Sequence, residues 1–73
     1  MIMLQVQIKN GNNVIFVSEI YKTKKHIDNV KKLIDSVMDT YSLSCIELKN
    51  INGDHCYIPK TILHNNIITM CEY

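Results

Sequence analysis

Arginine, alanine and tryptophan are absent from this chain of 73 residues, and there are only two glycines and one proline. Because arginine is the preferred side chain for bidentate contacts to phosphate and guanine, any anion site must use lysine and backbone amides. Gly11 and Gly53 stand too far apart for a P-loop or a G-x-G-x-x-G fingerprint. The formal net charge of +1 also excludes a strongly basic nucleic-acid binder and a strongly acidic mimic of DNA.

Cysteine and histidine are present, but they lack the spacing of a metal site. Structural zinc sites show ligand pairs such as C-x₂₋₄-C or H-x₃₋₅-H, and no such pair occurs among Cys45, Cys56, Cys71, His26, His55 and His64. For nucleophilic catalysis, neither an orienting acid nor an oxyanion loop is recognisable near a cysteine and histidine. The sequence therefore predicts no metal, no cofactor and no enzymatic activity.

Size and cysteine usage indicate one small domain in a reducing compartment. The cysteine count is odd and no secretory signal leads the chain, which predicts the cytoplasm. No run approaches the about 18 apolar residues of a membrane span. A single domain covering residues 1–73 would be marginally stable unless a partner covers apolar surface. We therefore expect a homo-oligomer, a dimer in the simplest case, with a well-packed monomer as the alternative.

The segment from Thr23 to Tyr41 is predicted to be an amphipathic helix with Thr23 as its N-cap. Its apolar residues recur at the helical period and form one stripe, namely Ile27, Val30, Ile34, Val37, Met38 and Tyr41. A helix with one apolar stripe has to bury it against other elements. The flanking segments supply strands for this purpose.

Alternating apolar and polar residues predict strands on both sides of the helix. Residues 2–8 alternate regularly, and the Asn10-Gly11 pair predicts a hairpin turn into a second strand over 14–21. A second hairpin joins strands over 45–49 and 55–58, a short helical turn begins at Pro59, and 67–73 is a closing strand. The predicted fold is α+β, an antiparallel sheet of four to five strands (ββαββ with or without a fifth) and one helix packed on one face.

The first hairpin predicts which strand residues face the core. A turn of either length places Ile15 and Val17 on the face of Leu4 and Val6. The opposite face then carries four apolar residues, Met3, Val14, Phe16 and Ile20. Because a single helix covers one side of a sheet, these four residues are predicted to bind a partner, with Phe16 at the centre. The alternative is that the C-terminal segment covers this face within the monomer.

Five of the eight lysines lie just before the helix or in its first half, namely Lys22, Lys24, Lys25, Lys31 and Lys32. This placement opposes the helix dipole, which favours basic residues at the C-terminal end. The cluster is a candidate anion-binding site, or a surface that steers an acidic partner. A solvated helix face without a further role explains the same pattern. Phosphate contacts from these lysines would be weak and salt-sensitive, so recognition of nucleic acid is not expected.

Two segments carry a resemblance. GDHCYIPKTILHNNIITM combines a turn glycine, a short strand into Ile-Pro and an Ile-rich last strand, and KNGNNVIFVSE stands near the start. They resemble small uncharacterised proteins of phages and mobile elements of low-GC Gram-positive bacteria, and no functional residue carries over. The resemblance implies a protein of the host-cell cytoplasm that binds and occludes a host or defence protein, as anti-CRISPR proteins do. The alternative is an oligomer that sequesters a signalling nucleotide.

Overall fold

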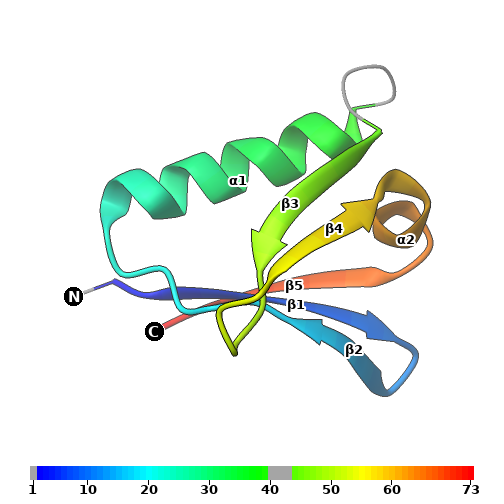
Figure 1. Ribbon diagram of the computed structural model, residues 1–73, viewed down its shortest axis with the longest axis horizontal. Coiled ribbons are helices and arrows are strands. Elements are labelled where there is room, and N and C mark those ends of the chain that lie inside the picture. Colours follow the sequence, from blue (N-terminus) through cyan, green and yellow to red (C-terminus); the bar gives the residue numbers. More distant parts are fainter. Residues whose placement is uncertain (1, 40–43) are drawn as a thin grey trace.

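The computed structural model describes residues 2–39 and 44–73 and shows an α+β fold with antiparallel strands and one main helix (Figure 1). The elements in chain order are β1 (Leu4–Asn10), β2 (Asn13–Val17), α1 (Lys24–Met38), β3 (Cys45–Lys49), β4 (His55–Pro59), α2 (Lys60–His64) and β5 (Ile67–Glu72). The predicted fold class is confirmed at this level. The strands differ from the prediction because they form a three-stranded sheet, β2-β1-β5, and a two-stranded hairpin, β3-β4, instead of one sheet.

The three-stranded sheet is built around β1, which pairs antiparallel with both neighbours. The register with β5 runs without interruption from Leu4 opposite Glu72 to Lys9 opposite Ile67. The chain turns from β1 into β2 through Gly11 and Asn12, and of these two residues Gly11 alone has positive φ, at 62°. This is the pattern of a type II′ turn, in which glycine takes the first central position.

A β-bulge in β2 makes the prediction for Phe16 wrong. Ile8 pairs with Phe16, but the next residue of β1, Lys9, pairs with Val14, so Ile15 is the extra residue of the bulge. Directly opposite residues share a face, which places Phe16 on the side of Ile8, where it packs against the core. Ile15, which the sequence predicts on the core face, is instead 50% exposed. Loop length alone changes the register by two, whereas a bulge changes it by one and inverts the faces.

Helix α1 follows the predicted pattern closely. Thr23 is the N-cap, and its Oγ1 accepts a hydrogen bond from the His26 N–H at 3.3 Å. Four residues of the predicted stripe are buried, Ile27, Val30, Ile34 and Val37. Met38, the last residue of the helix, is 40% exposed. The predicted contribution of Tyr41 lies outside the described residues.

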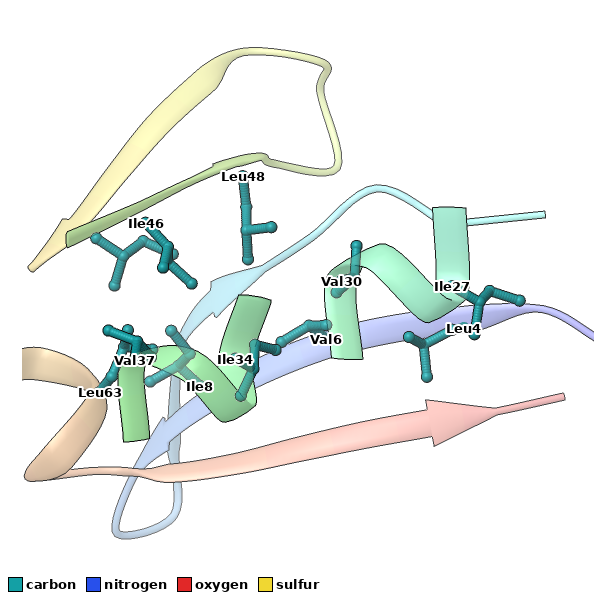
Figure 2. Close-up of a cluster of buried hydrophobic side chains, with 11 residues drawn as sticks. Leu4, Val6, Ile8, Ile27, Val30, Ile34, Val37, Ile46, Leu48 and Leu63 are labelled. Atoms are coloured by element: carbon teal, nitrogen blue, oxygen red, sulfur yellow. The ribbon is translucent and has the colours of Figure 1, made fainter. Parts of the chain in front are cut away.

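The core receives side chains from the sheet, the helix and the hairpin (Figure 2). Figure 2 shows Ile46 and Leu48 pointing from the hairpin toward α1 and β1. The buried cluster consists of Leu4, Val6, Ile8, Ile27, Val30, Ile34, Val37, Ile46, Leu48, Ile58 and Leu63. The helix is therefore packed against the hairpin as well as against the sheet.

Ser18 connects the sheet to the hairpin. Its side chain is fully buried, and its Oγ accepts a hydrogen bond from the Val6 N–H and donates one to the Glu19 carbonyl, both at 2.8 Å. Ser18 also forms a β-bridge with Asn50, beyond the end of β3. The hydroxyl thus takes the place of a backbone hydrogen-bond acceptor for β1, at the point where the chain leaves the sheet for the hairpin.

Candidate interaction surface

The face of the three-stranded sheet that points away from the core is called the outer face below. Leu4, Val6 and Ile8 of β1 enter the core, so the alternate residues of β1 and their cross-strand partners lie on the opposite side. The outer face consists of Gln5, Gln7, Lys9, Val14, Val17, Ile67, Thr69 and Cys71. Lys9 is the one charged residue in this set.

One end of the outer face is apolar and open to solvent. Val14 and Ile67 flank Lys9 from the two neighbouring strands, and they are 48% and 61% exposed. Ile15, the bulge residue next to Val14, is 50% exposed. Three exposed aliphatic residues thus lie near the turn at Gly11, two on β2 and one on β5 on the other side of Lys9, and we call Val14, Ile15 and Ile67 the apolar end.

The other end of the outer face is polar and closed. The side chain of Gln5 is buried, although it lies on the outer face. Its Nε2 donates a hydrogen bond to the Ser18 carbonyl at 3.1 Å, and its Oε1 accepts one from the Tyr73 hydroxyl at 3.3 Å. Buried amide groups that have both kinds of partner are held in place. The polar end therefore has its hydrogen bonds made within the chain.

The structure separates the four residues predicted to bind a partner. Val14 lies in the apolar end, and Met3, whose backbone pairs with Tyr73, falls on the outer face by alternation. Ile20 is 41% exposed, but it lies between Ser18 and Tyr21 and lines a hollow with Lys22 and Lys49. Phe16 belongs to the core side. Of the four residues, only Val14 belongs to the apolar end.

Sequence reasoning missed Ile15 and Ile67 as surface residues. Ile67 belongs to the last strand, and its face could be assigned only after its register with β1 was known. The alternation of Ile67, Thr69 and Cys71 with Ile68 and Met70 was the available signal, because the latter two pack against the core. No sequence pattern indicates the bulge at Ile15.

Three of the five predicted anion-binding lysines surround one cavity. Lys22, Lys24 and Lys31 line a cavity of about 410 Å³ together with Ile2, Ile27, Asp28 and Glu72. Lys31 Nζ lies 2.5 Å from Glu72 Oε1, and this hydrogen bond raises the pKa of the Lys31 ammonium. Lys25 and Lys32 are exposed elsewhere on α1 and do not line it. Because α1 packs on the core side of the sheet, the four lysines on α1 do not lie on the outer face.

The face of the hairpin that points away from the core carries a polar cluster. Glu47 lies opposite Tyr57 across the two strands, and its Oε1 is 3.3 Å from His55 Nδ1. Hydrogen bonds from Tyr57 and, to a lesser degree, from His55 lower the pKa of the Glu47 carboxyl. The bond to Glu47 in turn raises the pKa of the Tyr57 hydroxyl. Polar groups on this face therefore bond to one another.

The cysteines do not converge on a site. All three are free, with Cys45 exposed and Cys56 and Cys71 half-buried. Within residues 2–39 and 44–73, no group of three or more histidine, cysteine or acidic side chains could hold a metal ion. No helix among those residues is long and apolar enough to cross a membrane.

No family model matches the chain, and neither a curated protein nor a solved structure shows significant similarity to it.

Proposed function

We propose that this chain is a small non-catalytic interaction protein that binds and occludes a larger protein through the apolar end of its outer face. The supporting observation is the exposure of Val14, Ile15 and Ile67 near one end of a sheet whose other face is already buried. A cluster of exposed apolar side chains bordered by polar residues is typical of protein contact sites. Here Lys9 lies between Val14 and Ile67, and Gln7 follows it on the same face.

The scaffold of this surface suits recognition of a partner. Val14 and Ile67 are both paired with Lys9 of the central strand, so their backbone is already ordered before binding. A preformed surface loses little conformational entropy on association. The resemblance to proteins of phages and mobile elements supports a partner of the host cell, and we propose inhibition of a host or defence protein in the cytoplasm.

Two exposed isoleucines provide a matched test. Ile15 lies in the apolar end, and Ile51 lies in the turn of the hairpin with 62% of its surface exposed. Affinity-tagged protein is used to capture a partner from bacterial lysate, and the captured protein is then purified and titrated by calorimetry. We expect Ile15→Lys to weaken binding by about 30-fold or more, since it buries an unpaired charge, and Ile51→Lys to leave the dissociation constant unchanged.

Equal dissociation constants for wild type and Ile15→Lys would contradict this surface. Circular dichroism of both variants shows whether they remain folded. Loss of binding on Ile51→Lys with retention on Ile15→Lys would move the site to the hairpin.

The cavity at the start of α1 favours a second candidate, sequestration of a nucleotide by an oligomer. Three lysines line the cavity, and Ile2 and Ile27 add apolar wall against which a base can lie. Lys24 and Lys25 are adjacent in sequence, but only Lys24 lines it. Calorimetric titration with a panel of mono- and dinucleotides should show heat that Lys24→Gln removes and Lys25→Gln preserves. No heat for any nucleotide would dismiss this candidate.

A further inference from the structure

β5 is an edge strand of the three-stranded sheet, and some of its backbone N–H and C=O groups point away from its neighbour β1. The N–H of Met3 bonds to the carbonyl of Tyr73, and the N–H of Tyr73 bonds to the carbonyl of Met3, at 3.3 and 2.9 Å. In an antiparallel pair such doubly bonded residues alternate with residues whose N–H and C=O point outward. The outward residues of β5 are therefore Ile68, Met70 and Glu72. No residue that the structure describes bonds to their outward groups.

β5 lacks the features that usually prevent an edge strand from pairing. Such strands are typically short, interrupted by a bulge, or marked by proline or lysine. β5 runs from Ile67 to Glu72 with the sequence IITMCE, and its register with β1 contains no shift. This strand is therefore a ready template for a further antiparallel strand.

The outward groups of β5 are complementary to those of an identical strand. A two-fold axis at Met70 makes Met70 the partner of Met70 in the second copy, and Ile68 the partner of Glu72 in both directions. All three outward residues are then hydrogen-bonded on each strand. A shift of the axis by one residue leaves one of the three without a partner in β5. We propose that the protein forms a homodimer by antiparallel pairing of β5 with β5 about an axis at Met70.

The same register matches the side chains. It sets Ile67 opposite Tyr73 of the second copy, so two exposed apolar side chains, at 61% and 60%, cover one another on the outer face. It sets Thr69 opposite Cys71, both small enough for the closer spacing of pairs that are not hydrogen-bonded. Glu72 already bonds to Lys31 of its own chain, so its charge is compensated when Ile68 of the second copy lies beside it.

This dimer goes beyond the proposed function because it uses the edge of the sheet, whereas the proposed partner site uses its face. In the six-stranded sheet formed by two copies, Tyr73 of the second copy covers Ile67, and Val14 and Ile15 of each copy remain open to the partner. Ile15 lies on β2, at the far edge from β5, so a change there tests partner binding alone.

Disulfide cross-linking tests both the pairing and its register. The background carries Cys45→Ser and Cys56→Ser and keeps Cys71, and Thr69→Cys is added. In the proposed register the introduced thiol lies opposite Cys71 of the second copy, within the span of a disulfide. We expect mild oxidation to give a covalent dimer with Thr69→Cys. The background with Cys71 alone should remain uncross-linked, since its two cysteines are offset by two residues along the strands.

Charge reversal tests the same contact without cross-linking. Thr69→Lys combined with Cys71→Lys puts like charges opposite each other twice, and we expect the dimer to weaken by about tenfold or more. Thr69→Lys with Cys71→Glu puts opposite charges in the same positions and should restore the dimer. Sedimentation equilibrium from micromolar to submillimolar concentration measures both, with circular dichroism as the control for folding.

Two results would overturn the proposal. One is a wild-type protein that sediments as a monomer over the whole concentration range. The other is cross-linking of Cys71 alone as efficient as with Thr69→Cys, which would exclude the axis at Met70. Either result leaves the Ile15→Lys comparison unaffected, so failure of the dimer and failure of the partner site are distinguishable.

Discussion

The three-stranded sheet and the β3-β4 hairpin bury one face each in the same core, but their other faces differ. The hairpin surrounds Glu47 with the hydrogen-bonding groups of Tyr57 and His55. The sheet instead exposes Val14, Ile15 and Ile67 around a single lysine. The polar groups of the hairpin face thus bond to one another, whereas the sheet face leaves aliphatic side chains exposed to solvent.

The two strand edges show the same contrast. β4 ends in Pro59, which has no N–H to offer to a further strand. β5 has no proline and no lysine, and Ile68 and Met70 direct their N–H and C=O groups outward. An edge strand without such features can pair with a strand of another chain. The unprotected edge of β5 thus fits a surface on which association serves the protein.

The largest effect that separates the two regions comes from a core position of the hairpin. Leu48 is 5% exposed. We expect Leu48→Ala to lower the free energy of unfolding by about 2 to 5 kcal/mol, because it removes buried methyl groups and leaves a cavity. Ile15→Ala at the exposed bulge of β2 should change the stability of the monomer by about 0.5 kcal/mol or less. Urea titrations of both variants in dilute solution measure the difference, and similar losses for the two would contradict the assignment of faces.

The junction between the regions should give the next largest effect. Ser18→Ala leaves the Val6 N–H without the hydroxyl that it bonds at 2.8 Å. We expect a loss of about 1 to 3 kcal/mol in the free energy of unfolding, the usual result of stranding a buried polar group. Ser44→Ala, at an exposed position, is the matched control and should have little effect. A stability for Ser18→Ala equal to that of the control would show that the hydroxyl is dispensable.

The smallest effect concerns the charge of Glu47. Its pKa is lowered in the folded state, so its contribution to stability is present above the unfolded pKa and is lost as the pH falls through the folded pKa. Replacing Tyr57 by Phe removes the larger of the two hydrogen bonds and should raise the pKa of Glu47 toward its ordinary value. Carboxyl NMR titration of wild type and Tyr57→Phe measures this shift. An unchanged Glu47 titration in Tyr57→Phe would refute the assignment.

The helix and the hairpins were predictable from local patterns, and the faces of the first hairpin were not. The stripe from Ile27 to Val37 follows from periodicity. Gly11 indicates the turn of the first hairpin, because that turn requires a residue with positive φ. The bulge at Ile15 inverted the assignment of Phe16, because one extra residue is enough to exchange the two sides of a strand. The edge position of β5 depends on pairing between distant segments, which no local pattern encodes.

Amide hydrogen exchange along β5 tests most directly whether a second copy completes the three-stranded sheet. In the proposed dimer the N–H groups of Ile68 and Met70 are bonded, so at high protein concentration they should exchange as slowly as those of Thr69 and Cys71, which bond to β1. Dilution should then restore fast exchange at Ile68 and Met70 alone. Fast exchange at these two residues beside slow exchange at Thr69 and Cys71, at every concentration, would contradict the account.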